Sequence, residues 1–522
     1  MAITFITSTS SSTATVNDSS HGALVGDFVV LSNASTGNST LNSQLNKEHE
    51  IITVPTSGTY TITLSDNAAA TLSSAGSADA EYQINTGINT VVPGDGWGAG
   101  TWSSDGWGSA SSETAGGGTL RLWSQDNFGD DLIFNLKDGF VFYWDKTLGT
   151  SVRAKNLIEL SDAAPTKSRK VIVSERDRHV LCFGANPIGE TAQDRLLVRF
   201  SHQENPFFWT PTATNTAGSL RIGSGSEIVT AVKTRREMIV LTDTSVHSVQ
   251  FIGPPFTFGV NQLASAITVR GFNSAVAVGD SVFWMGYDRF YIYDGRVQVL
   301  PCSVRDHVFQ DFNETQSDKI YAGINSAFGE VFWFYPSNTN SSANGGTDEN
   351  DRYVVYNYDQ KIWYVGSLSR TSWIDRGVYQ YPLATDSNLV YNHEKGNDND
   401  GTAFTSFIQS SPIDIQDGDQ FVFLRRMIPD VSFDNSDNDI GEASKFVHMT
   451  LTGQRSPGGG FLTASSSSPA NQVSTVTVNS STEIGHVRLR ARSFGLRVTS
   501  SASKVNWRLG TNRVDIRADG DR

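Results

Sequence analysis

The feature that most constrains this chain is a long succession of short apolar strands separated by turn residues, which runs from residue 119 to about 408. Within it, MIVLTDTSVHSVQFIG (238–253) aligns with VFWMGYDRFYIYDG (282–295), and each reads as a strand, an Asp-containing turn and a strand. The two turns lie 45 residues apart. A related unit, IYAGINSAFGEVFWFY followed by RYVVYNYDQKIWYV, supplies four strands. Four strands at this period are typical of a β-propeller blade.

The repeat predicts about six blades. Helix is scarce, and we expect two short helices within 303–321, with Ser303 capping the first and Asn313 the second. The Gly-rich stretch RIGSGSE (221–227) lies between two strand patterns and is interpreted as a β-turn. The candidate blades lie near 120–157, 169–210, 226–253, 273–300, 319–366 and 373–408.

Strand patterns also flank the propeller, so the chain is predicted to be all-β. Residues 1–81 form a small N-terminal β-domain, whose first 20 residues contain eleven Ser or Thr and are expected to be a flexible lead or an edge strand. The propeller itself is assigned to 119–408. Residues 409–522 are predicted to form a separate C-terminal β-sandwich-like domain.

A Gly/Trp-rich segment, residues 82–118, separates the first domain from the propeller. It contains DGWG twice and ends in a Ser/Gly run. A free linker would lack the large anchors Trp97, Trp102 and Trp107. We therefore expect an ordered loop that these tryptophans hold against a domain or subunit surface.

Composition excludes several classes of protein. The chain has 54 acidic and 40 basic residues and a net charge of −14, so it is not expected to coat nucleic acid. Two cysteines, Cys182 and Cys302, cannot make a disulfide framework or a four-cysteine zinc site and are expected to be small buried residues. No apolar run approaches the roughly 18 residues of a membrane span, and the start resembles no signal peptide.

The charge is unevenly distributed. Residues 483–522 hold nine basic and four acidic residues, which predicts that this segment meets an acidic surface. In the strand HVRLRARSF, alternation places Arg488, Arg490 and Arg492 on one face. This face is either an interface with acidic residues of a neighbouring subunit or partner, or the solvated side of an ordinary half-buried strand. Nucleic-acid binding is a third possibility, which the net charge disfavours.

The search for catalytic motifs is negative. The sequence contains no HExxH, GxSxG, Walker or GxGxxG motif, and no two of its nine histidines have metal-ligand spacing. His179 is interpreted as part of a hydrated turn rather than as a base. Asp398, Asp400 and Gly401 fit part of a calcium loop, but the later Glu of such a loop is absent, which favours an ordinary turn. We predict no catalytic residue, no metal, no cofactor and no enzymatic activity.

Several long phrases resemble tail proteins of short-tailed, podovirus-type bacteriophages, and together they cover nearly the whole chain. They are not generic β patterns. One is RFSHQENPFFWTPTATNTAGSLRIGSGSEI, and another is VFWMGYDRFYIYDGRVQVLPC. The matching segments are 82–145, 199–228, 251–259, 282–302, 350–366 and 505–522.

The resemblance implies a tail nozzle protein, also called a tail tubular or packaged-DNA stabilisation protein. Such proteins are β-propellers that form a homo-hexameric ring below the portal and adaptor of the virion tail. The ring continues the DNA-exit channel, retains the packaged DNA and provides attachment for fibres, spikes or a plug. Genomic DNA passes without specific binding, and we expect an electronegative lumen because like-charged walls do not hold phosphates.

Two other functions remain open. A propeller adhesin or glycan-acting enzyme of the phage tail would act on host surface polysaccharide and would need a cleft with two close carboxylates amid aromatic residues. A host-derived extracellular propeller is disfavoured by the missing signal peptide. The resemblance also implies a further segment of roughly a hundred residues before the point where this chain begins, which usually supplies part of the propeller. Either the chain starts at an internal site or another element closes the ring.

Overall fold

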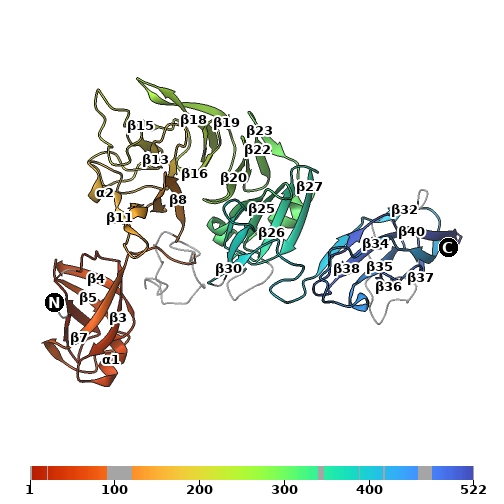
Figure 1. Ribbon diagram of the computed structural model, residues 1–522, viewed down its shortest axis with the longest axis horizontal. Coiled ribbons are helices and arrows are strands. Elements are labelled where there is room, and N and C mark those ends of the chain that lie inside the picture. The colour runs from red at the N-terminus through yellow and green to blue at the C-terminus, as the bar shows by residue number, and fades with distance from the viewer. Residues whose placement is uncertain are drawn as a thin grey trace, which may run out of the picture. The chain divides into compact units, whose positions relative to one another are not determined.

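The computed structural model describes residues 3–19, 21–90, 120–338, 346–386, 388–414, 418–456 and 473–520. The fold is all-β, with a small β-domain, a propeller and a C-terminal β-sandwich (Figure 1). The chain divides into two compact units, Met1–Tyr391 and Asn392–Arg522. Within the described ranges, none of the helices has the length and apolarity that crossing a membrane demands.

Unit 1 begins with a seven-stranded antiparallel sheet in the order β6-β1-β2-β5-β4-β3-β7. Its core includes Phe5, Val16 and Tyr60, and helix α1 (Ser39–Leu45) adds two buried leucines. Asn38 caps this helix by accepting a hydrogen bond from the Leu41 backbone N–H at 3.0 Å. The strands are β1 (Thr4–Thr7), β2 (Thr13–Asn17), β3 (Phe28–Ser35), β4 (Glu48–Thr56), β5 (Thr59–Thr63), β6 (Leu72–Ala75) and β7 (Ser77–Gln83).

The Ser/Thr-rich start lies inside this sheet, so the expectation of a flexible lead or an edge strand is wrong. Strands β1 and β2 pair with each other, and β6 and β5 cover their outer edges. The reason is alternation: Phe5, Ala14 and Val16 are fully buried, while threonines occupy positions between them. Threonine suits the pleated surface because it is β-branched.

Six antiparallel sheets follow and form the propeller, as many as the repeat predicts. Blades 1, 4 and 5 have nearly the predicted bounds, whereas blades 2 and 3 each extend one strand further, to Arg221 and Ser265. The predicted end of the propeller at residue 408 is wrong, because the last blade ends at Asn392 and the strand Ser406–Gln409 pairs within the sandwich of unit 2. The first strand of each sheet contacts the first strand of the next, from β8 and β12 through to β24 and β28. Each blade therefore begins at the inner side of the propeller, and the chain then steps outward. Five sheets have four strands and the sixth has three.

The blades have the following bounds. Blade 1 is β8 (Trp123–Phe128), β9 (Asp131–Leu136), β10 (Val141–Trp144) and β11 (Lys155–Asn156). Blade 2 is β12 (Lys170–Val173), β13 (Val180–Phe183), β14 (Leu197–Phe200) and β15 (Gly218–Arg221). Blade 3 is β16 (Ile228–Lys233), β17 (Met238–Thr242), β18 (Ser245–Gly253) and β19 (Thr257–Ser265).

The later blades follow the same order. Blade 4 is β20 (Ala275–Val278), β21 (Ser281–Met285), β22 (Phe290–Tyr293) and β23 (Val297–Leu300). Blade 5 is β24 (Tyr321–Asn325), β25 (Glu330–Tyr335), β26 (Arg352–Asn357) and β27 (Ile362–Ser367). Blade 6 is β28 (Ser372–Ile374), β29 (Leu383–Asp386) and β30 (Leu389–Asn392).

Aromatic side chains fill the space between blades. The ring of Phe290 in blade 4 lies 4.9 Å from that of Trp333 and 4.7 Å from that of Trp363 in blade 5, measured between centroids. Middle strands such as β25 are buried on both faces, so their sequences read as continuous apolar runs. Cys182 is fully buried in β13, whereas Cys302 is half-buried after β23, and both are free thiols.

Short helices lie between blades. Helix α3 (Arg305–Gln310) and the 3₁₀ helix η2 (Glu314–Lys319) occupy the predicted segment between blades 4 and 5. Asn313 caps η2 as expected, but the residue before α3 is Val304, with no side-chain cap, so the assignment of Ser303 is wrong. The remaining short helices are η1 (Lys146–Leu148), α2 (Leu157–Leu160) and, in unit 2, η3 (Glu442–Ser444).

Unit 2 is a β-sandwich. One sheet has the order β31-β38-β35-β36, with β32 also pairing β38, and the other has the order β37-β33-β40. Leu424 and Leu489 from the second sheet pack against Leu451 and Phe494 from the first. The strands are β31 (Ser406–Gln409), β32 (Ile413–Asp414), β33 (Val422–Ile428), β34 (Val431–Ser432), β35 (Phe446–Gln454), β36 (Val473–Asn479), β37 (Gly485–Ala491), β38 (Ser493–Ser500), β39 (Arg508–Leu509) and β40 (Arg513–Ala518).

Candidate functional site

The predicted interface residues fall into two groups. Trp97, Trp102 and Trp107 lie outside the described residues. Arg488 and Arg490 lie on the outer face of β37, while the residues that alternate with them are buried against the sandwich core. The period of two therefore orients this strand as the sequence predicts.

Part of this arginine group is paired within unit 2. Arg490 donates from Nε to the carboxylate of Asp519 at 2.5 Å, and Arg492 donates to the backbone carbonyl of Asp419. Both guanidinium groups lie over the ring of Phe421, at 4.2 and 4.8 Å from its centroid. These contacts hold the two side chains in defined positions.

The other strands of the same sheet carry four further arginines, which sequence reasoning missed. Arg425 and Arg426 lie on β33, and Arg513 and Arg517 lie on β40. All four are exposed. The arginines are visible in the sequence, in LRRMI and RVDIRAD. Only the strand pairing shows that β33 lies between β37 and β40, so that their arginines share one face.

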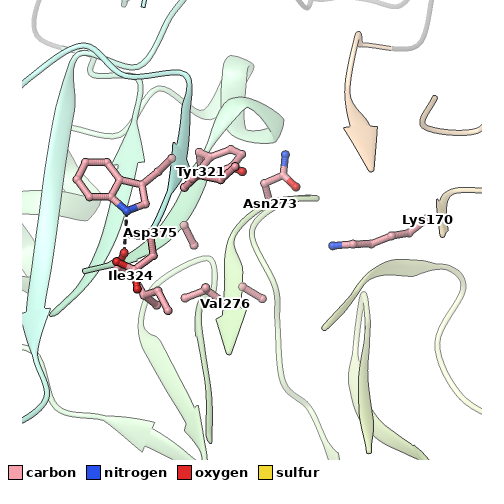
Figure 2. A pocket seen from close by; sticks show the side chains of 11 residues that line it. Lys170, Asn273, Val276, Tyr321, Ile324 and Asp375 are labelled. Atoms are coloured by element: carbon pink, nitrogen blue, oxygen red, sulfur yellow. Dashed lines mark hydrogen bonds between the residues drawn. The ribbon is translucent and has the colours of Figure 1, made fainter. Parts of the chain in front are cut away.

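A second candidate site is a pocket of about 360 Å³ among the inner strands of the propeller (Figure 2). Its walls come from β20, β24 and β28, and Lys170 of β12 contributes an amine. Gly323 allows the close approach of two blades here, because a Cβ at this position would lie 2.5 Å from Cδ1 of Trp373. The indole Nε1 of Trp373 donates to the Ile324 carbonyl at 2.7 Å.

Lys170 is the most unusual group in this pocket. Its Nζ donates to Oγ1 of Thr230 at 2.9 Å and lies 5.0 Å from the ring centroid of Phe272. Burial lowers the pKa of Lys170 to about 8, although the charge of Asp126 opposes this shift. Figure 2 shows the amine pointing toward the side of the pocket that carries Asn273 and Val276. At neutral pH the group is still mainly cationic.

The pocket has one carboxylate among its lining residues, Asp375. This carboxylate accepts hydrogen bonds from the backbone N–H groups of Arg376 and Ser326, at 2.8 and 3.3 Å. The paired carboxylates that a glycosidase requires are not assembled in this lining. With one amine and one carboxylate, the pocket could bind a small polar molecule.

An ion cluster joins the first three blades. Arg169, only 5% exposed, pairs with Asp138 at 3.1 Å and with Glu227 at 3.0 Å, and Glu227 also pairs with Arg195 at 2.7 Å. Burial raises the pKa of Asp138, but the hydrogen bond and charge of Arg169 outweigh it and lower the pKa below its ordinary value. These ion pairs link residues from the first three blades.

Two histidines are also part of the propeller core. His179 is fully buried, and its Nε2 lies 3.0 Å from Oγ1 of Thr216, so its interpretation as a hydrated turn is wrong. Aromatic neighbours such as Phe258 exclude water from it. The Nε2 atom of His247 lies 2.9 Å from Oγ of Ser245, and burial lowers the pKa of His247.

The acidic turns contain local hydrogen bonds. The Asp398 carboxylate accepts from the Gly401 backbone N–H at 3.0 Å, as in an ordinary turn. In the ranges that the structure describes, no group of three or more His, Cys, Asp or Glu side chains could hold a metal ion.

No protein-family model matches the sequence, and no curated protein shows significant similarity. A computationally designed protein, Ika8, aligns over 51% of this chain and 69% of its own, with 10% identity and a TM-score of 0.31. A fungal alcohol oxidase of the AA5 family aligns over 74% and 84%, with 10% identity and a TM-score of 0.33.

The phage phi92 endosialidase aligns over 75% of this chain and 56% of its own, with 10% identity and a TM-score of 0.21. This chain therefore spans about half the length of that protein. At these scores none of the three structures carries an argument about what this chain does.

Proposed function

We propose that this chain is a structural virion protein: the subunit of a tail nozzle ring in a short-tailed bacteriophage. The ring is a homo-hexamer below the portal and adaptor. It continues the DNA-exit channel, helps to retain the packaged genome and provides attachment for fibres, spikes or a plug. DNA passes through it without specific binding.

The observation that supports this proposal most is that the phage-like phrases coincide with a propeller fold. The phage-like phrases run from residue 82 to the C-terminus, and the blades they traverse have the propeller architecture that the resemblance implies. The blades meet through aromatic packing and buried ion pairs, such as Arg169 with Asp138.

The charge distribution is a second support. Residues 1–391 contain 26 basic and 39 acidic residues, whereas residues 392–522 contain 14 and 15. An acidic wall repels phosphates and lets DNA slide. A channel lined by unit 1 would meet that requirement.

The proposal is tested by labelling virions with gold-tagged antibodies and imaging them in negative stain. One antibody recognises residues 82–118 and the other residues 486–498. Gold at the short tail supports the nozzle assignment. Gold on lateral appendages alone would favour the adhesin or glycan-acting enzyme instead, and absence of both labels from particles opened with denaturant would contradict a virion role.

A further inference from the structure

The outer face of the sheet β37-β33-β40 is an arginine face. Its register places Phe423 between Arg490 and Arg517, and one step further along it places Arg426 between His486 and Asp515. An irregularity between Leu424 and Arg426 lets consecutive residues of β33 both point outward. The face comprises Arg425, Arg426, Arg488, Arg490, Arg513 and Arg517.

Most of the arginines in this face have no ion-pair partner among the described residues. Arg490 pairs with Asp519, and Arg426 pairs with Asp515 at 3.1 Å. Among the described residues, no carboxylate forms an ion pair with any of the other four arginines of the face. The opposite side of the sheet is covered by the sandwich core, so these guanidinium groups point into solvent.

The N-terminal β-domain presents a face of opposite charge. Residues 1–83 contain seven acidic residues and one basic residue. On β4, Glu48 and Glu50 point outward while His49 and Ile51 are buried. On β7, Asp79 and Glu81 are exposed. We call the outer side of β4-β3-β7 the acidic face.

The two faces have the same layout. In the acidic face, Val30 of the middle strand lies between Glu48 and Glu81, and Phe28 lies between Glu50 and Gln83. In the arginine face, Phe423 occupies the equivalent middle position. Since neighbouring strands are about 4.8 Å apart, each face has two charged rows roughly 10 Å apart with half-buried apolar side chains between them.

We propose that the arginine face of one copy binds the acidic face of a second copy. The two surfaces differ, so the contact is head-to-tail and repeats around a ring when the rotation closes. Guanidinium groups pair with carboxylates in two parallel rows, and the apolar middle strands lie against each other. This inference rests on the proposed function, because it names the surfaces through which nozzle subunits meet.

A second copy fits better than nucleic acid for two reasons. The chain carries a net charge of −14, which opposes approach to phosphates. The arginine face also has the half-exposed Phe423 and the 40%-exposed Ile428 on its middle strand, which match an apolar strip better than a phosphate backbone.

The carboxylates of the acidic face have few partners among the described residues, so they can pair with arginines of a second copy. Glu81 makes one ion pair, with Arg153 at 3.5 Å, and both side chains are more than two-thirds exposed. Asp79 accepts from Asn33 at 2.8 Å. Glu48 and Glu50 make no ion pair with the described residues and are the most direct partners for arginine.

The test is a charge swap measured by mass photometry and analytical ultracentrifugation of the full chain at low salt. Variant A is R488E/R517E and variant B is E48R/E50R. The control, R235E/R236E, makes the same change of charge as variant A in the exposed turn between β16 and β17. Circular dichroism and thermal melting establish that each variant is folded.

We expect the wild type and the control to assemble, and variants A and B each to associate about 100-fold more weakly, because like charges then face each other. Mixing A with B should restore assembly, since the reversed faces complement one another. Wild-type assembly should weaken with added salt.

Three results would overturn the inference. If A and B assemble as well as the wild type, the contact lies elsewhere and the ring function survives. If the wild type stays monomeric up to the highest soluble concentration, the ring function fails together with the contact. If variant A assembles normally but loses binding to labelled single-stranded or duplex DNA that the wild type binds, the arginine face serves nucleic acid instead.

Discussion

Arginine has two distinct environments in the two units. In unit 1, Arg169, Arg199, Arg270 and Arg370 are all 5% exposed or less, and they bind carboxylates, backbone carbonyls and aromatic rings. In unit 2, no described arginine is buried to that extent, and six of them share one sheet face. The buried arginines hold parts of the propeller together, as Arg169 does for the first three blades, whereas the arginines of unit 2 lie at the surface, where a second molecule can reach them.

This difference teaches where each arginine acts. A buried guanidinium stabilises the fold only while its partners remain, because an uncompensated charge in the interior is costly. An exposed guanidinium contributes little to stability but can direct association. The comparison therefore predicts large effects on unfolding in unit 1 and large effects on assembly in unit 2.

The largest effect is expected for R169M. The change leaves the carboxylates of Asp138 and Glu227 without their buried partner, and the free energy of unfolding should fall by about 3–5 kcal/mol. Urea denaturation monitored by tryptophan fluorescence measures it. The control is R236M, which removes a mostly exposed pair with Asp280 at 3.4 Å and should cost less than about 1 kcal/mol. Equal losses in the two variants would refute the comparison.

The next effect concerns Lys170. Because its folded pKa, about 8, lies below that of a free lysine, its contribution is unfavourable below pH 8 and disappears above about pH 10.5. The stability of K170M relative to wild type should therefore rise by about 3 kcal/mol as the pH falls through that window. Urea midpoints at pH 10.5, 9 and 7 measure the difference. A difference independent of pH would mean that the amine is well solvated.

Asp138 gives the opposite pH dependence. Its folded pKa is lowered, so its stabilising effect is present above the ordinary carboxyl pKa and is lost as the pH falls through the folded value. At pH 7, D138N should be about 1.5–3 kcal/mol less stable than wild type, the range for a hydrogen bond to a charged group. Thermal melts between pH 7 and pH 2 should show the two proteins converging. A constant gap would indicate a packing defect instead.

The smallest effect is expected for the exposed arginines. The double variant R488A/R517A should unfold within about 0.5 kcal/mol of wild type in urea, because neither side chain has an ion pair among the described residues. A loss above about 2 kcal/mol would show that the arginine face is needed for the sandwich itself.

The sequence predicts the propeller well because its signal is local. Each blade is a run of short apolar strands with turns between them, and six such sheets appear, although the ends of blades 2, 3 and 6 differ from the predicted bounds. Asn313 was identified as a cap for the same reason, since its side chain acts on the residue two positions later. Ser303 fitted the same pattern, but helix α3 begins two residues after it.

Features that depend on distant segments were not predictable. His179 looked like a turn residue beside charged neighbours, but Phe200 and Phe258 from other strands bury it. The pocket around Lys170 needs four blades to converge. The arginine face could be recognised only from the pairing of β33 with β37 and β40. Alternation along β37 alone predicted only the arginines of that strand.

The most direct test of the two arginine environments is phenylglyoxal footprinting with peptide mass spectrometry, on the protein assembled at low salt and on the dissociated protein at high salt. We predict that Arg169 and Arg270 are unreactive in both states, that Arg235 is reactive in both, and that Arg488 and Arg517 lose reactivity on assembly. Equal reactivity of Arg488 and Arg517 in the two states would contradict the account.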